Sequence, residues 1–168
     1  MTHKVGTRGS LSITVPPPFI KQPTEKDGYI IVARDLMQGV EALSTLNGIS
    51  PRACSLIAGQ ALECALKAFL CHKGKEAEIR RRNVQHDLSA LWDLAYKEKS
   101  LGITSTLPEW VKILSWGHGP NFYFRYQEGQ KDSKGNRTIV HGGQTPALIP
   151  MAAELGKLIR KVQDIIKE

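Results

Sequence analysis

Three polar residues share one face of an otherwise apolar segment, and their types could hold or move a proton. Gln60, Glu63 and Lys67 are spaced at i, i+3 and i+7, which places them on one side of a helix. His86 and Asp87 follow at the predicted start of the next helix. Because an imidazole titrates near neutral pH, His86 could act as a general acid or base. These five residues are the first candidates for a site.

Each of these residues also has a structural interpretation. Glu63 and Lys67 could form a solvated i, i+4 ion pair worth about 0.2–0.5 kcal/mol, or a polar seam that lines a groove or a dimer interface. His86 could bond the backbone at a helix start. Asp87 could cap that helix, or pair with Arg81 or Lys67. The sequence leaves these interpretations open.

A run of arginines precedes the histidine. Guanidinium groups bind phosphate in a bidentate manner, and Arg80, Arg81 and Arg82 are consecutive. They could clamp the phosphates of a nucleotide or of RNA, or they could belong to a solvated loop. With Arg81 or Arg82 beside it, His86 could activate a 2′-hydroxyl of RNA while the arginine stabilises the charged phosphorane.

Aromatic residues later in the chain suggest a second kind of contact. Tyr123, Arg125 and Tyr126 could offer a surface on which a base stacks, although such aromatics also cover the edge of a core. His118 lies between two glycines and could complete a site with His86. Nothing in the sequence fixes the distance between the two histidines.

Composition favours a single globular domain with an anionic partner. The chain has 168 residues, 41% of them apolar, and a formal net charge of +7. Basic chains favour nucleic acids, nucleotides or acidic proteins. We expect no membrane span, because the chain lacks an unbroken apolar run of about 18 residues. The first residues carry no apolar signal region, so we expect a cytoplasmic protein.

The cysteines and the absence of common motifs narrow the chemistry. Cys54, Cys64 and Cys71 fall in one predicted helix, which predicts buried, reduced thiols. A zinc site built from Cys64, Cys71 and His72 is the alternative, although its spacing matches no common ligand pattern. We find no Walker loop, dinucleotide fingerprint, zincin helix or Gly-x-Ser-x-Gly elbow. We therefore expect no metal and no cofactor.

The elements predicted from the sequence are mostly helical. Residues 1–28 are rich in proline and glycine and predict an extended arm with a short strand at 10–15. Ser50 and Pro51 are a strong helix-start signal. The expected helices cover residues 29–46, 51–71, 87–99, 109–116, and a last stretch from 145 or 149 to the C-terminus. A β-hairpin is expected from strands at 122–126 and 137–141, with 10–15 as a possible third strand.

The predicted fold is thus a mostly α, up-and-down bundle of about five helices with a small hairpin or three-strand appendage. The arm at 1–28 precedes one domain at 29–168, and the hairpin is an insertion near 122–141. This order of elements resembles a HEPN domain (higher eukaryotes and prokaryotes nucleotide-binding). The resemblance rests on three segments: Gln60-Ala-Leu-Glu63-x-x-x-Lys67-Ala, His86-Asp87-Leu88-x-x-Leu91, and Phe124-Arg125-Tyr126.

The resemblance implies a bundle that usually forms a homodimer. Some HEPN domains are metal-independent ribonucleases, often toxins of toxin–antitoxin systems, with an arginine four to six residues before a histidine. Arg81 and His86 match that spacing. In those ribonucleases the pair lies near the last helix, whereas here it precedes the third. Near the last helix, Arg137 and His141 have only three residues between them.

The function expected first is therefore non-catalytic. The chain would bind a nucleotide, RNA or a protein partner on a basic edge that carries His86. The candidate ligand-binding residues are Gln60, Glu63, Lys67, Arg80, Arg82, Asp87, Tyr123, Arg125 and Tyr126. One alternative is a metal-independent ribonuclease that uses His86 with Arg81 or Arg82. Another is a structural partner of a separate nucleotidyltransferase.

Overall fold

The protein is mostly α-helical, as predicted. The computed structural model describes residues 25–46, 50–119, 124, 128–131, 137–139 and 145–168. The helices in this part are α1 (Glu25–Thr45), α2 (Pro51–His72), α3 (Glu76–Ile79), α4 (Leu88–Lys97), α5 (Glu109–His118) and α6 (Leu148–Lys167). The strands are β1 (Glu128–Lys131) and β2 (Arg137–Ile139).

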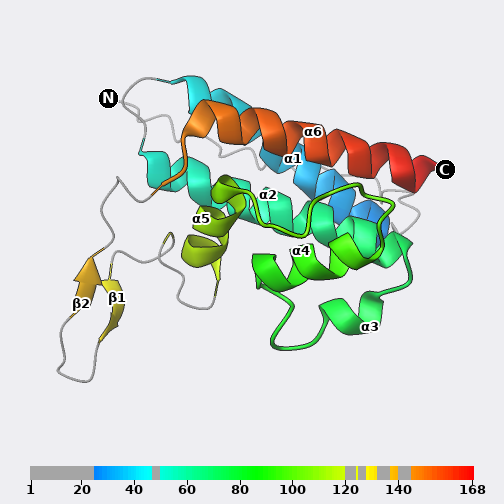
Figure 1. Cartoon of the computed structure of the whole chain (residues 1–168). Coiled ribbons are helices and arrows are strands. Elements are labelled where there is room, and N and C mark those ends of the chain that lie inside the picture. Colours follow the sequence, from blue (N-terminus) through cyan, green and yellow to red (C-terminus); the bar gives the residue numbers. More distant parts are fainter. Residues whose placement is uncertain (1–24, 47–49, 120–123, 125–127, 132–136, 140–144) are drawn as a thin grey trace, which may run out of the picture.

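Helix α2 is the centre of the fold and contacts α1, α3, α4, α5 and α6. Figure 1 shows α1 and α6 side by side along one side of α2, with α4 and α5 on the other. The helix starts as the sequence predicts, with Ser50 in an extended conformation and Pro51 in the first turn. Because α2 is covered on several sides, every residue from Ala61 to Cys71 is buried.

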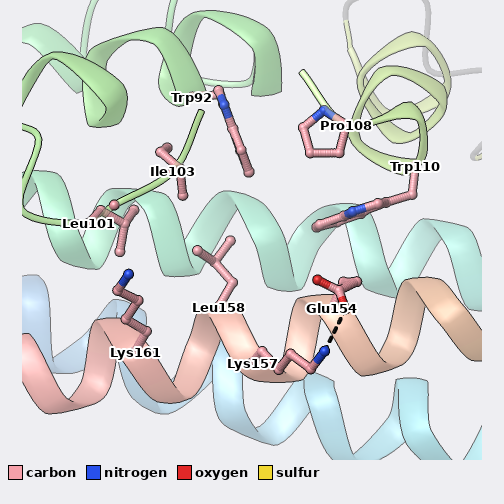
Figure 2. A pocket seen from close by; sticks show the side chains of 10 residues that line it. Trp92, Leu101, Ile103, Pro108, Trp110, Glu154, Lys157, Leu158 and Lys161 are labelled. Carbon is pink, nitrogen blue, oxygen red and sulfur yellow. Dashed lines mark hydrogen bonds and ion pairs between the residues drawn. The ribbon is translucent and has the colours of Figure 1, made fainter. Parts of the chain in front are cut away.

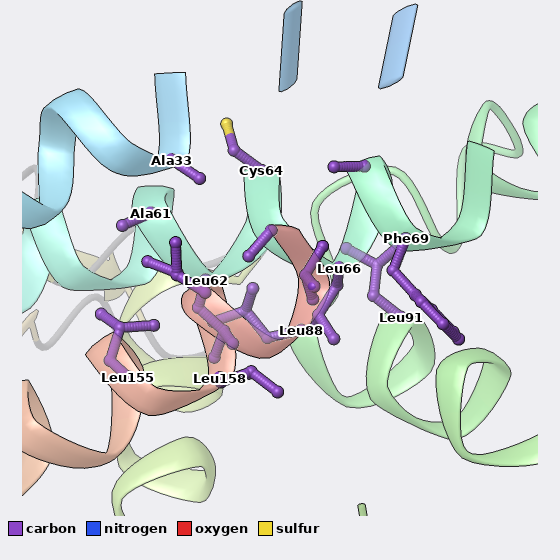
Figure 3. Close-up of a cluster of buried hydrophobic side chains, with 14 of the residues drawn as sticks. Ala33, Ala61, Leu62, Cys64, Leu66, Phe69, Leu88, Leu91, Leu155 and Leu158 are labelled. Carbon is purple, nitrogen blue, oxygen red and sulfur yellow. The ribbon is translucent and has the colours of Figure 1, made fainter. Parts of the chain in front are cut away.

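The core forms where leucines of three helices meet. Leu62 and Leu66 of α2 are fully buried, as are Leu88 and Leu91 of α4. Leu155 of α6 closes the cluster from the other side, and Figure 3 shows these side chains facing one another. Burying one such side chain stabilises the fold by about 1.5–3 kcal/mol. This core holds α2 in place, and the candidate site is built on α2.

Helices α1 and α5 extend beyond their predicted bounds, and α4 ends at Lys97, two residues before its predicted end. Helix α1 begins at Glu25 rather than at residue 29, so residues 25–28 of the predicted arm are helical, and the rest of that prediction lies outside the described residues. Glu25 and Asp27 lie in its first turn, where acidic residues are stabilised by the helix dipole. Helix α5 continues through Gly117 to His118, although we expected Gly117 to end it. A Cβ on Gly117 would lie 2.2 Å from the Phe124 ring, so the glycine is required for packing.

The two strands pair antiparallel, with Glu128 opposite Ile139 and Lys131 opposite Arg137. Strand β2 lies within the predicted 137–141 segment. Strand β1 follows the aromatic run at 122–126 instead of coinciding with it. Of that run only Phe124 is described, and the strand expected at 10–15 lies outside the described residues. The three-strand appendage therefore stays a prediction.

Helix α2 is long and apolar enough, by length and composition alone, to cross a membrane. Most of the qualifying stretch is buried inside the bundle, and a core helix passes the same test. The expectations about membranes and location stay predictions.

Asp87 caps α4, which confirms the structural interpretation of this residue. Its carboxylate accepts hydrogen bonds from the backbone N–H groups of Ser89 and Ala90 at 2.9 and 3.1 Å. Asp87→Ala should lower the free energy of unfolding by about 0.5–2 kcal/mol, measured by urea denaturation. Asp93→Ala, on an exposed position of the same helix, is the control and should change stability by less than about 0.5 kcal/mol. Equal effects of the two variants would contradict the capping role.

A buried carboxylate joined to two histidines

Glu63 is the hub of the candidate site. Its side chain is buried in the middle of α2, and its carboxylate contacts three basic groups. The Lys67 Nζ lies 2.7 Å from Oε1 and the His118 Nε2 lies 2.7 Å from Oε2. The His86 Nδ1 lies 3.2 Å and 3.3 Å from the two oxygens. We call Glu63, Lys67, His86 and His118 the Glu63 network.

Three separate elements position these side chains. Glu63 and Lys67 are one turn apart on α2, so the helix itself brings them together. His86 ends a series of turns immediately before α4, and the Asp87 cap fixes that junction. His118 is the last residue of α5. A Cβ on Gly59 would lie 2.9 Å from His118 Nδ1, so the ring packs directly against the α2 backbone.

Glu63 is ionised at neutral pH. Burial raises the pKa of its carboxyl group. The hydrogen bonds from His118 and Lys67, together with the positive charge of Lys67, lower the pKa further than burial raises it, to about 2. Lys67 is also buried and compensates the carboxylate charge, and its ammonium lies 5.7 Å from the centre of the Tyr29 ring. The exposed-pair interpretation of Glu63 and Lys67 is therefore wrong, and the polar seam lies inside the protein.

The two histidines differ in exposure. His118 is 2% exposed. Because a carboxylate only accepts hydrogen bonds, His118 must donate its Nε2–H, and its buried Nδ1 has no partner among the described residues. The His86 side chain is 51% exposed. When Nδ1 donates to Glu63, the Nε2 of His86 is the nitrogen left to act on another molecule.

Glu63 and His86 together have the chemistry of a histidine that is oriented by a carboxylate. A carboxylate that accepts from one ring nitrogen fixes the tautomer and orientation of the imidazole. His86 can therefore accept and return a proton at Nε2. The expectation that His86 merely bonds the backbone is wrong, since its Nδ1 is bound to Glu63.

The remaining residues predicted for the site fall into different places. Gln60 is half-buried, and its amide Nε2 lies 3.6 Å from Cys64 Sγ, outside the Glu63 network. Arg80 pairs with Glu25 of α1. Arg81 and Arg82 are exposed, and neither makes an ion pair within the described part of the chain.

The other candidate site residues either lie outside the described residues or have properties that do not suit a reactive site. Tyr123, Arg125 and Tyr126 fall outside the described residues. All three cysteines are buried free thiols, as predicted. Burial raises the pKa of Cys71 to about 11, which makes this thiol a poor nucleophile. Where the chain is described, no three His, Cys, Asp or Glu side chains form a group that could hold a metal ion.

His118 is the residue whose role the sequence did not reveal. The sequence suggests His118 only as an addition to a site with His86, whereas the structure brings both histidines onto one carboxylate. His118 and Glu63 are 55 positions apart in the chain, so no local spacing relates them. The only available signal was a histidine flanked by glycines at a helix end, which is common.

Comparison of the chain with protein-family models, with curated proteins and with solved structures finds no match. The features that bear on function are therefore the geometry of the Glu63 network and the exposed basic residues that precede His86.

Proposed function

We propose that the chain is a HEPN-like bundle that binds the phosphate groups of RNA or of a nucleotide. The proposed contact surface consists of Arg81, Arg82 and His86, which we call the basic rim. The observation that carries the proposal is the imidazole of His86, which is half exposed and whose Nδ1 is bound to the buried carboxylate of Glu63. The up-and-down arrangement with a three-strand appendage belongs to the same proposal.

Charge supports this assignment. Arg81 and Arg82 are exposed on the turns that lead to His86, and the backbone N–H groups of Val84 and Gln85 bond to the Arg81 carbonyl oxygen. These turns keep the arginines and His86 on one short segment. Guanidinium groups recognise phosphate geometry, and the net charge of +7 favours an anionic partner.

Binding can be measured by fluorescence polarisation with labelled single-stranded RNA in EDTA at several salt concentrations. The double variant Arg81→Ala/Arg82→Ala should weaken binding by about tenfold or more. It should also reduce the slope of log K against log salt by about 1.4, because each lost phosphate contact to a single strand removes about 0.7.

A matched control removes two arginines from another face. Arg34 on α1 and Arg160 on α6 are exposed, so Arg34→Ala/Arg160→Ala makes the same change in net charge. This control should keep the salt slope of the native protein. Equal losses in both double variants would indicate nonspecific attraction and would overturn the basic rim, as would no RNA or nucleotide binding by the native protein.

A second candidate, a metal-independent ribonuclease, is favoured by the bond between Glu63 and His86. In that reaction the Nε2 of His86 takes the proton of a 2′-hydroxyl. The 2′-oxygen then attacks phosphorus to form the 2′,3′-cyclic phosphate, and the bond between phosphorus and the 5′-oxygen breaks as that oxygen takes a proton from water. His86 afterwards returns its own proton to the solvent. Arg81 or Arg82 would stabilise the charge on the phosphorane.

Cleavage on a denaturing gel in EDTA separates the two candidates. If the protein is a ribonuclease, His86→Ala should reduce the rate by about 10²–10⁴-fold, the usual contribution of a general acid or base. His72→Ala, at the end of α2, is the control and should keep the native rate. Binding without cleavage would leave the binding module as the function.

The proposed homodimer and the proposed nucleotidyltransferase partner are further predictions. The exposed large apolar side chains of the described residues, including Ile31, Tyr96, Trp116 and Ile149, come from four different helices.

A further inference from the structure

A small, open pocket lies away from the Glu63 network, between α4, the loop that follows it, α5 and α6. Its volume is about 180 Å³. Pockets that bind drug-sized ligands are larger, with volumes of about 300–1,000 Å³. We call it the tryptophan pocket, because Trp92 and Trp110 form part of its wall. Figure 2 shows Trp92 and Pro108 above it and the α6 side chains below it. Its size suits a ligand of roughly ten non-hydrogen atoms.

The wall of the pocket offers apolar surface and few polar atoms. The rings of Trp92 and Trp110 are 6.5 Å apart at 87°, an edge-to-face arrangement. The indole N–H of Trp92 already donates to the Thr104 carbonyl oxygen at 2.9 Å. The Trp92 ring therefore presents carbon surface to a ligand, and Leu158 adds an aliphatic side chain.

The charged side chains of the pocket differ in whether an opposite charge compensates them. Glu154 and Lys157 pair with each other at 2.7 Å and so leave no net charge between them. Lys161 also lines the pocket, and it makes no ion pair with any other residue that the structure describes. The edge of the tryptophan pocket therefore carries one positive charge, that of Lys161, which no carboxylate of the described residues compensates.

The position of Lys161 follows from a glycine in the loop. Gly102 has φ = +60°, and a Cβ there would lie 2.6 Å from the Lys161 Nζ. The ammonium therefore rests on the loop backbone, and Figure 2 shows the side chain extending towards Leu101. Any larger side chain at position 102 would displace it. The loop thus leaves room for an ammonium group at the mouth of an apolar cavity.

We propose that the tryptophan pocket binds a small organic carboxylate whose body is a flat, apolar ring. The ring would lie against Trp92 and Trp110, and the carboxylate would accept a charge-assisted hydrogen bond from Lys161. The same chemistry occurs in a free aryl acid and in the C-terminal aromatic residue of a peptide. The proposal is independent of the basic rim and of RNA binding.

The test uses 3-phenylpropionate and its neutral amide, followed by NMR of the full chain. The indole N–H signals of Trp92 and Trp110 should shift with saturation at millimolar acid. Trp116 does not line the pocket, so its signal should stay in place and is an internal control. The amide should bind about tenfold more weakly than the acid, because it loses the charge-assisted bond.

Two charge variants make the result specific. Lys161→Gln should reduce the affinity for the acid to that for the amide and leave amide binding unchanged. Lys167→Gln removes the same charge from the exposed end of α6 and should bind the acid like the native protein. Equal binding of acid and amide by the native protein, or equal effects of the two variants, would overturn the assignment of Lys161.

Binding measurements with peptides identify whether the carboxylate belongs to a free acid or to a peptide terminus. An acetylated peptide ending in phenylalanine is compared with the same peptide amidated at its C-terminus. Tighter binding of the free-acid peptide than of 3-phenylpropionate would assign the pocket to a peptide terminus, and the reverse order would assign it to a free acid. No saturable shift with any of these compounds would overturn the proposal.

Discussion

Glu63→Ala should lower the free energy of unfolding by about 3–5 kcal/mol, because it leaves a buried ammonium without its counter-charge. Lys67 is 6% exposed, and the structure gives its ammonium no other carboxylate partner among the described residues. The buried His118 would lose its hydrogen-bond acceptor in the same variant. Urea denaturation of both proteins at neutral pH gives the difference.

The control is an ion pair of equal length at the surface. Glu154 and Lys157 also lie 2.7 Å apart, but both are exposed. Glu154→Ala should cost less than about 1 kcal/mol. Similar losses in Glu63→Ala and Glu154→Ala would contradict the role of Glu63 as a hub.

A double variant tests the reason for the loss. Glu63→Leu with Lys67→Met removes both charges and keeps much of the volume. Replacing a whole buried pair by apolar residues is often neutral or stabilising, so this protein should be more stable than Glu63→Ala. His118 still loses its acceptor, so recovery should be partial. No recovery would indicate that packing, and not the uncompensated charge, causes the loss.

Acidification should remove about 3 kcal/mol of stability through Glu63 alone. The pKa of Glu63 is about 2 in the folded protein against an ordinary value of 4.5. As pH falls, the unfolded chain therefore takes up the proton first. The contribution is complete above the ordinary value and is lost as pH falls towards 2. By about pH 3 the loss should have reached about 2 kcal/mol.

The measurement compares native protein with Glu63→Gln at neutral pH and at about pH 3. The glutamine variant is less stable at neutral pH, since Lys67 lacks its counter-charge, but it has no carboxyl group to titrate at this position. Its stability should therefore fall by about 2 kcal/mol less than that of the native protein over the same interval. Parallel pH profiles would show that the pKa of Glu63 is the same in the folded and the unfolded chain, which would contradict the stabilising contacts of its carboxylate.

The sequence predicts those parts of the structure that depend on neighbouring residues. Ser50 and Pro51 mark the start of α2, and Asp87 caps α4, because each signal acts within one turn. Predictions failed where distant residues decide. Gly117 normally favours a helix end, but here the Phe124 ring occupies the space that a side chain would need.

In the candidate site, too, the contacts between residues close in sequence could be predicted, and those between distant residues could not. The pairing of Glu63 with Lys67 follows from their i, i+4 spacing, but their burial depends on the packing of other helices around α2. The contact of His86 with Glu63 spans 23 positions and that of His118 spans 55. A single sequence does not report such separations, so the role of His118 emerged only from the structure.

The packing of His118 on Gly59 has a consequence for tracing relatives of this chain. Gly59 and Glu63 are one turn apart, and His118 contacts both. A lineage that acquired a bulkier residue at position 59 would have to give up the second imidazole, so the two positions should vary together. Glycine, glutamate and lysine at four-residue intervals, followed by two distant histidines, form a compound signature for recognising homologues of low overall similarity.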